Sequence, residues 1–209
     1  MLYSIWVRAV YPFASLGHHV SLHYTCDLHN TGLIKLGNFI TVHKDVWLHA
    51  HSSAADEGDL KLIIDDNCFI GRRSHISARN GIHIERDVML AASVLITDSG
   101  HSFSDISIPI REQGITEGGH IRIGQGCWIG QGAVILCDKG ELVLGRNCVV
   151  GANAVVTRSA PPYSVLSGNP ARIVKQYNPE KGVWVLGSAA TATDTSPAAA
   201  PRAGGSSTS

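Results

Sequence analysis

The sequence contains few aromatic residues, few charged residues and no excess of either charge. Aromatic residues make up 6% and charged residues 16% of the 209 positions, and 17 basic side chains balance 17 acidic ones. A protein that binds nucleic acid through its phosphates needs a basic surface, so this composition argues against nucleic acid as a partner. No apolar run reaches the roughly 18 to 20 residues that a membrane-spanning helix requires. The core must therefore be built from aliphatic and small residues, among them 22 glycines.

The cysteine pattern argues against a disulfide framework and against a zinc site. The five cysteines are odd in number and contain no C-x-x-C pair. Disulfide-stapled domains carry even sets, and structural zinc sites use closely spaced pairs. We therefore expect a reducing compartment, a cytoplasmic location and no metal requirement.

Two terminal segments differ in composition from the rest of the chain. The start is apolar at helical spacing, at Leu2, Ile5, Trp6, Ala9 and Phe13. It lacks a cleavage site for a signal peptide, so we predict a short N-terminal helix within a cap segment, residues 1–35. Peripheral contact of this helix with a membrane is the alternative, and we do not expect it. The end is rich in Ala, Ser, Thr, Pro and Gly, which predicts a disordered tail over residues 187–209.

Between these segments an aliphatic residue recurs at every sixth position. Six residues accommodate one short strand and a turn, and three such units close a triangular coil whose aliphatic side chains stack on the next coil. The repeat predicts an all-β protein with a parallel β-helix of about five coils. Five groups of three carry it: Leu36, Val42 and Leu48; Ile64, Ile70 and Ile76; Ile84, Leu90 and Ile96; Ile123, Ile129 and Ile135; Leu144, Val150 and Val156.

The residues between the aliphatic positions predict the corners of the coils. The residue four places after each aliphatic one is usually small, and Cys68, Cys127 and Cys148 occupy such positions, so we interpret them as buried apolar residues. Every break in the spacing follows the third turn of a coil, so all insertions leave from the same corner. The longest, 97–122, predicts a projecting loop, and loops of this length inside a compact repeat usually carry function.

Three segments make the chain resemble the hexapeptide-repeat acyltransferases. They are ITDSGHSFSD at 96–105, GITEGGHIRIGQGCWIG at 114–130 and VVGANAVVTRSAPPYSVLSGNPARIVK at 149–175. The likeness is strongest to the branch that O-acetylates sugars, which includes enzymes of surface-polysaccharide biosynthesis and the maltose and galactoside acetyltransferases. It covers residues 36–177, and it implies a left-handed β-helix, a homotrimer, acetyl-CoA as co-substrate and a C-terminal segment that packs back over the coils.

His101 is the candidate catalytic residue. Moving an acetyl group from a thioester to a sugar hydroxyl requires a base, and a neutral imidazole is suited to this. His101 stands where the family places its catalytic histidine, and the preceding Gly100 is expected to expose the ring. No Ser–His or Cys–His pairing is evident, so we expect direct transfer without an acyl-enzyme. Asp98, Asp105 or a backbone carbonyl remains open as the group that orients the imidazole.

The resemblance also implies which residues contact acetyl-CoA. Near the thioester it places Trp128, Gly130 and Ala133, and along the pantetheine arm Ala152 and Thr157. Because the nucleotide end of the co-substrate is anionic, Arg158, Arg172 and Lys175 are candidate phosphate contacts. For the sugar acceptor the candidates are Ser77, Arg79 and Asn80, which are equally compatible with an ordinary turn.

Three other functions remain open at this point. The first is N-acetylation of an amino sugar on the same scaffold, and the second is a trimeric scaffold without catalysis. The third is zinc-dependent hydration, because the γ-class carbonic anhydrases share this fold and the sequence has 11 histidines. In that class two zinc ligands lie five residues apart, and His101 has no such partner. The sequence therefore favours an acetyl-CoA-dependent O-acetyltransferase that acts on a sugar or a polysaccharide precursor.

Overall fold

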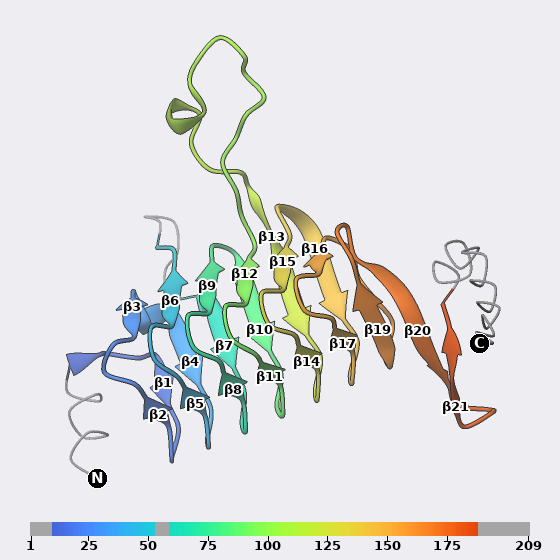
Figure 1. Cartoon of the computed structure of the whole chain (residues 1–209). Helices are drawn as coiled ribbons and strands as arrows, with labels where there is room; N and C mark the ends of the chain where they lie inside the picture. The colour runs from blue at the N-terminus through green and yellow to red at the C-terminus, as the bar shows by residue number, and fades with distance from the viewer. Residues whose placement is uncertain (1–9, 53–58, 188–209) are drawn as a thin grey trace, which may run out of the picture.

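The protein is a parallel β-helix with one long loop that rises from its side (Figure 1). The structure is a computed structural model and describes residues 10–52 and 59–187. Each coil passes in turn through three sheets, here called A, B and C, and like strands of successive coils pair in parallel. The predicted all-β class and parallel β-helix are confirmed.

The strands of the coils are short and lie in register. Sheet A contains β1 (Ser15–Leu16), β4 (Ile34–Leu36), β7 (Leu62–Ile64), β10 (Gly81–Ile84), β13 (Gly118–Ile123) and β16 (Lys139–Leu144). Sheet B contains β2 (Ser21–Leu22), β5 (Thr41–Val42), β8 (Phe69–Ile70), β11 (Met89–Leu90), β14 (Trp128–Ile129), β17 (Val149–Val150) and β19 (Ser164–Ser167). Sheet C contains β3 (Asp27–His29), β6 (Trp47–Ala50), β9 (His75–Ala78), β12 (Leu95–Thr97), β15 (Val134–Leu136) and β18 (Val155–Val156).

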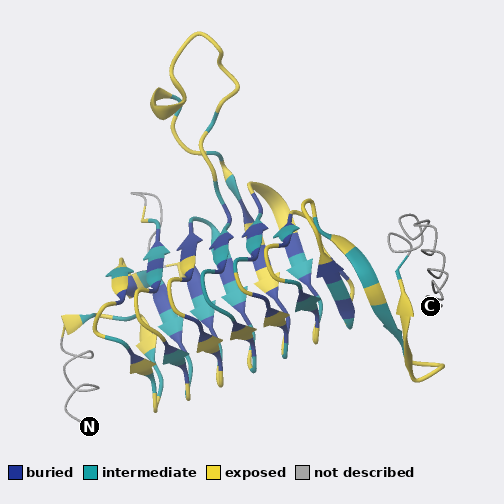
Figure 2. Ribbon diagram, in the orientation of Figure 1, coloured by how far each residue is buried: buried dark blue, intermediate teal, exposed yellow. Residues whose placement is uncertain are grey.

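The core is the column of aliphatic side chains inside the coils, and the buried residues recur in the strands of successive coils (Figure 2). All fifteen aliphatic residues of the predicted repeat are buried, with at most 2% of their surface exposed. Burial of one such side chain stabilises the fold by about 1.5 to 3 kcal/mol, so the stack is the main source of stability. The five cysteines are free and buried, as the sequence predicts. Burial raises the pKa of the Cys68 thiol to about 12, which makes it unreactive.

The turns between strands use residues that tolerate the left-handed backbone region. Asn67, Asp87 and Asn153 have φ near +60°, a conformation that short polar side chains adopt more readily than most. Asn67 Nδ2 donates a hydrogen bond of 2.7 Å to Asp87 Oδ1 in the next coil. The corners are therefore tied along the helix axis as well as within each turn.

The structure contains one coil more than the sequence predicts. Strands β1, β2 and β3 form a first coil from Ser15 to His29, within the segment that we assigned to the cap. Leu16, Leu22 and Leu28 supply its period of six, but Leu16 and Leu28 are only half-buried, since among the described residues this is the first coil of the stack. The predicted N-terminal helix and the predicted tail lie almost entirely outside the described residues.

The long loop is shorter than predicted because the last residues assigned to it form a strand. Residues 118–122 were assigned to the loop, but they belong to β13, which pairs with β10 and β16. The loop proper is 98–117 and contains a short 3-10 helix, η2 (Ile110–Glu112). Another 3-10 helix, η1 (Thr31–Leu33), connects the first two coils.

The C-terminal segment packs back on the last coil as predicted by the resemblance. Strand β20 (Arg172–Asn178) runs antiparallel to β19, and β21 (Val183–Leu186) runs antiparallel to β20, so both extend sheet B. Among the described residues we find no helix with the length and apolarity needed to cross a membrane.

Candidate active site

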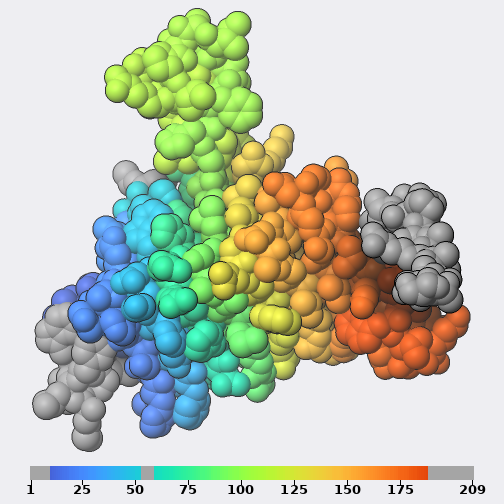
Figure 3. All heavy atoms as spheres, in the orientation of Figure 1, coloured from blue at the N-terminus to red at the C-terminus, as the bar shows by residue number. Residues whose placement is uncertain are grey.

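His101 projects from a neck that holds the two arms of the 98–117 loop together. The neck pairs His101 with Ile115 in an antiparallel bridge. Backbone hydrogen bonds on either side fix it: Thr116 N donates to Gly100 O at 2.8 Å, and Ser102 N donates to Gly114 O at 3.1 Å. Gly100 N also donates to the Thr116 hydroxyl oxygen at 3.0 Å. His101 is therefore exposed on a fixed backbone, in the loop that rises above the body of the protein (Figures 1 and 3).

Gly100 does not expose the histidine in the way that we expected. A Cβ added at this glycine meets no atom within 4 Å, and its φ lies outside the left-handed region. A larger residue would fit there without backbone strain. The hydrogen-bonded neck, and not the flexibility of glycine, sets the position of His101.

Asp98 lies at the root of the neck and fastens it to the coil below. Its side chain is fully buried, and its carboxylate accepts backbone N–H bonds from Arg79 at 2.7 Å, Asn80 at 2.9 Å and Gly81 at 2.8 Å. These bonds make Asp98 a structural residue, and among the described contacts no hydrogen bond joins its carboxylate to the His101 ring. Asp105, the other candidate, accepts bonds from the amide and hydroxyl of Ser107 further out on the loop.

The three predicted acceptor residues lie together at this corner but differ in availability. Ser77 is 9% exposed, and its hydroxyl pairs with His51 Nε2 at 3.1 Å, so it belongs to the wall of the corner. Asn80 donates from Nδ2 to Glu117 O at 2.8 Å and so braces the second arm of the loop. Arg79 is half-buried beside Gly118, which leaves its guanidinium as the best placed of the three for a ligand.

A cluster of imidazoles continues from this corner across sheet C. The ring centroids of His49 and His51 are 4.2 Å apart, and those of His29 and His49 are 5.5 Å apart. Burial is the main cause that lowers the pKa of His49, and the neighbouring His51 and His29 lower it further. Burial also lowers the pKa of His51, against the opposing effect of Asp98. Both rings are therefore held in the neutral form, with His49 Nδ1 buried and without a hydrogen bond.

Four of the predicted co-substrate residues lie at or near the turn between sheets B and C. We call this turn, in all coils, the BC corner, and the turn from sheet C to the next sheet A the CA corner. Trp128 is 48% exposed on the outer face of β14, and Ala152 is exposed at the BC corner one coil above. Arg172 is exposed opposite Ser167, directly above that turn. Lys175 is exposed further along β20, opposite Val165.

The structure places the other four candidates differently. Gly130 and Ala133 are buried; the N–H of Gly130 donates to Val150 O of the next coil at 2.7 Å, and the N–H of Ala133 donates to Gly130 O within the same turn at 3.1 Å. Neither has a side chain at the surface for a ligand. Thr157 and Arg158 are exposed, but they follow β18 and so lie at the CA corner. They are not on the same edge as Trp128.

Within one chain, His101 and the BC corner lie at different edges of the triangular β-helix. The chain from Gly130 to Leu136 crosses the whole of sheet C, and an extended segment of that length spans up to roughly 20 Å. His101 stands four residues beyond the end of β12. A single chain therefore does not bring the candidate base to Trp128, Ala152 and Arg172.

Sequence reasoning missed Asp98 and His51 as structural parts of this corner. Asp98 follows the last residue of β12 directly, and a carboxylate at the end of a buried strand is a signal that it accepts backbone N–H groups. His51 has a weaker signal, because its contact with Ser77 joins positions 26 apart in the sequence. Among the described residues no group of three His, Cys, Asp or Glu side chains is arranged to hold a metal ion.

Comparisons with known proteins agree with this architecture. The model for the hexapeptide repeat of succinyl-transferase matches residues 61–98 and 120–158. The putative lipopolysaccharide biosynthesis O-acetyl transferase WbbJ of Escherichia coli K12 is 30% identical over 169 residues, which cover 78% of this chain and 82% of that protein. The chain belongs to the hexapeptide-repeat acyltransferases.

Solved structures of other acyltransferases have a fold similar to that of this chain. The maltose O-acetyltransferase of Clostridium difficile 630 is 26% identical, with a TM-score of 0.51 over 83% of this chain and 73% of that one. AntD, an N-acyltransferase of Bacillus cereus solved with dTDP and 3-hydroxybutyryl-CoA, has a TM-score of 0.70 at 18% identity, over 85% and 90% of the two chains. At that identity the second likeness concerns the fold alone.

Proposed function

We propose that this protein is an acetyl-CoA-dependent O-acetyltransferase that acetylates a sugar hydroxyl in the biosynthesis of a surface polysaccharide. The observation that carries the proposal is the position of His101, an exposed imidazole on a hydrogen-bonded neck at the root of the long loop. The relative WbbJ, which is named as an O-acetyl transferase of lipopolysaccharide biosynthesis, supports the choice of acceptor.

The reaction needs one base and no enzyme-bound acyl group. His101 removes the proton from the acceptor hydroxyl as its oxygen attacks the thioester carbonyl. The tetrahedral intermediate then collapses, the C–S bond breaks, and the protonated imidazole returns its proton to the leaving thiolate of CoA. The cysteines that might have carried an acyl group, Cys127 and Cys148 among them, are buried, which supports direct transfer.

The BC corner suits a long, partly anionic co-substrate. Trp128 offers an apolar ring beside the small exposed residue Ala152, and Arg172 and Lys175 add exposed cations near the same edge. An apolar surface fits the pantetheine arm, and guanidinium and ammonium groups fit the phosphates of CoA. The acetyl group would then lie near Trp128, away from the His101 of the same chain.

A second copy of the chain is needed to complete this site. Sheet B exposes a row of apolar residues: Phe69, Met89 and Trp128 lie in register, at 38%, 45% and 48% exposure. The 98–117 loop is also apolar at exposed positions, with Ile106 fully exposed and Phe103 at 71%. Apolar surface of this extent is usual at protein interfaces. We therefore infer a homotrimer in which the loop of one copy brings His101 to the BC corner of the next.

The acceptor is tested by measuring CoA thiol release with a panel of neutral sugars, amino sugars and sugar nucleotides. Release that depends on a hydroxyl sugar, with an acetyl ester in the product, supports the proposal. Release only with an amino sugar, with an amide in the product, would make the protein an N-acetyltransferase instead. Failure to bind CoA at all would leave a scaffold without catalysis.

The base is tested by His101→Ala. Its loss removes a group that acts on the barrier, so turnover should fall by roughly 10² to 10⁴-fold while the affinity for acetyl-CoA changes little. Arg172→Ala is the matched contrast, because it removes a contact with the co-substrate and should mainly raise the KM for acetyl-CoA. Near-normal turnover in His101→Ala, or the same kinetic defect in both variants, would show that another group takes the proton.

A further inference from the structure

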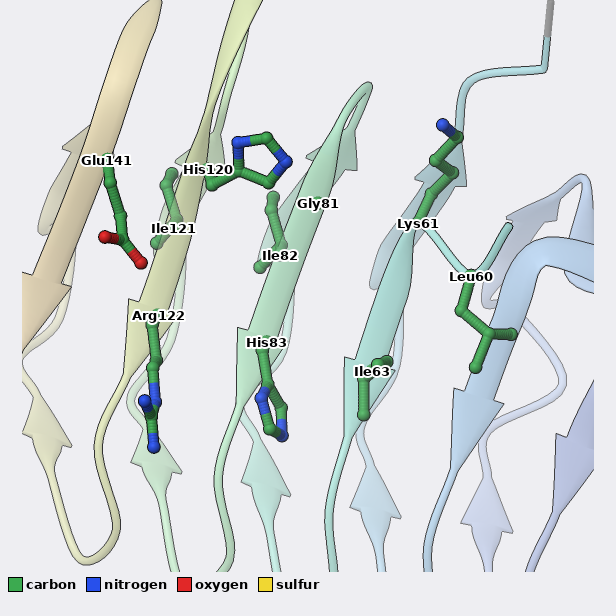
Figure 4. A pocket seen from close by; sticks show the side chains of 10 residues that line it. All are labelled: Leu60, Lys61, Ile63, Gly81, Ile82, His83, His120, Ile121, Arg122 and Glu141. Carbon is green, nitrogen blue, oxygen red and sulfur yellow. The ribbon is translucent and has the colours of Figure 1, made fainter. Parts of the chain in front are cut away.

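A hollow lies on the outer face of sheet A, beside the corner that carries the loop (Figure 4). Its volume is about 220 Å³, and its walls come from β7, β10, β13 and β16, which belong to four successive coils. The outer face of sheet A is mainly polar, with Ile63 and Val143 half-buried, whereas sheet B exposes the apolar row of Phe69, Met89 and Trp128. The hollow therefore lies outside the apolar row that we infer to be covered by a second copy.

The hollow exists because Gly81 has no side chain. Gly81 lies in register with His120 and, one strand further, with Glu141. The His120 ring leans toward it, and a Cβ on Gly81 would lie 3.0 Å from His120 Cδ2 (Figure 4). The φ of Gly81 is not in the left-handed region, so the backbone does not require glycine there. A glycine inside a strand often marks a place where a ligand approaches closely.

The hollow is joined directly to the candidate active site. Gly81 N donates to the Asp98 carboxylate at 2.8 Å, and Asp98 is the residue that roots the neck of the loop. The hollow begins two residues after Gly118, where the second arm of the loop enters β13. His101 is three residues after Asp98, which corresponds to roughly 10 Å of extended backbone. A ligand in the hollow thus lies below the base and at a distance from it.

Carboxylates balance the cationic groups of the hollow, Lys61 and Arg122, so that no net positive charge results. Arg122 Nε donates to Glu85 Oε1 at 2.7 Å, and His83 Nε2 lies 2.8 Å from Asp65 Oδ2. Glu141 adds an exposed carboxylate on the opposite wall. Such pairs present both donors and acceptors, as a polyhydroxyl compound requires, and they offer little attraction to a phosphate. Leu60 and Ile63 add apolar surface for the C–H face of a sugar ring.

We propose that this hollow is a second acceptor subsite, which binds a sugar unit of a neutral oligosaccharide at some distance from the hydroxyl that is acetylated. This inference rests on the proposed function, since it assigns that enzyme an oligosaccharide acceptor in preference to a monosaccharide. The paired charges point to a neutral glycan, and the distance to His101 requires that more than one sugar unit be present.

The substitution Gly81→Val tests the subsite. A β-branched residue suits a strand, and its closest new neighbour is the end of the movable His120 side chain, so the fold should be kept. In the full-length protein we expect the KM for a neutral oligosaccharide acceptor to rise about tenfold or more, with a much smaller change for the corresponding monosaccharide. The control is Lys35→Val, on the same face of sheet A but outside the hollow, which should change neither value.

A binding measurement separates failure of this inference from failure of the proposed function. Titration of a neutral oligosaccharide into the protein should shift the imidazole NMR signals of His120 in the wild type and not in Gly81→Val. If acetyl transfer to sugars is observed but neither the KM ratio nor these signals depend on Gly81, the subsite is wrong. An equal loss for short and long acceptors would also overturn it. Absence of transfer to any sugar, with His120 signals that still respond, would instead refute the proposed reaction.

Discussion

Asp98 shows how one buried side chain joins two coils at the corner that carries the candidate base. Three backbone N–H groups of the coil below converge on its carboxylate, and Gly119 N donates to its carbonyl oxygen at 2.7 Å. The turn 79–81 and both arms of the loop are thereby held in one arrangement. The position of His101 depends on this carboxylate although the two side chains are three residues apart.

The first prediction concerns the replacement Asp98→Asn. An amide keeps one acceptor oxygen but turns an NH₂ group toward backbone N–H donors, so at least one buried hydrogen bond to a charged group is lost. We expect the free energy of unfolding to fall by about 1.5 to 3 kcal/mol, measured by denaturant titration. Asp105→Asn is the control, because that carboxylate is exposed and bonded only within the loop. Equal effects of the two substitutions would contradict the structural role of Asp98.

The second prediction concerns pH and the histidines of sheet C. The folded protein lowers the pKa of His49 and His51, chiefly by burial, so the unfolded chain binds protons on these rings more readily. Stability should therefore be full above the unfolded value of about 6.5 and should decrease as the pH falls below it. Denaturant titrations at pH 7.5 and 5.5 measure this slope. The double variant His49→Gln, His51→Gln should have a shallower one, and an unchanged slope would show that other groups are responsible.

At the scale of the element, the repeat of six predicts strands and core residues well because the same spacing is imposed in every coil. Ile70, Leu90 and Ile129 stack on one another in register, so each confirms the position of the next. The first coil escaped this prediction although its three aliphatic positions keep the spacing of six, and two of them, Leu16 and Leu28, are only partly buried. The outward-facing positions of this coil are rich in histidine, which makes its aliphatic spacing less distinct in the sequence.

The same regularity explains why parts of the site could not be predicted. Small residues at the corners serve the stacking of coils and the binding of ligands alike, and the sequence does not separate the two. Exposure depends on the position within the turn: Ala152, two residues after Val150, is exposed, whereas Ala133, four residues after Ile129 in the coil below, is buried. The hollow at Gly81 depends on four strands that the insertions of the chain separate widely in sequence. Only the folded arrangement brings them together.

The third prediction compares an inner and an outer aliphatic side chain. Ile129 is fully buried in the stack, so Ile129→Ala should leave a cavity and lower the free energy of unfolding by about 2 to 5 kcal/mol. Val143 is only half-buried on the outer face of sheet A, and Val143→Ala should cost clearly less. Denaturant titration of both variants makes the comparison. Similar losses would mean that the stack is not the main source of stability.

At the scale of the whole molecule, the candidate functional groups lie on different edges and faces of the triangular β-helix. The CA corner carries the loop and His101, the BC corner carries Trp128 and Ala152, and sheet A carries the polar hollow. In the trimer that we propose, placing copies side by side with the apolar row of sheet B covered would unite two different edges in one site. It would also leave sheet A facing solvent, where a long acceptor could enter.

The last prediction tests whether the site is shared between copies. His101→Ala removes the base, and Ala152→Trp places a large side chain on the exposed BC corner, so each variant alone should be inactive. When both are produced together and assemble at random, roughly a quarter of the interfaces should pair an intact His101 with an intact corner. Thiol release should therefore return to about a quarter of the wild-type rate, and light scattering should show a trimer for all samples. If every site were built within one chain, each would carry one of the two defects and no activity would return, so an inactive mixture of properly assembled trimers would contradict the shared site.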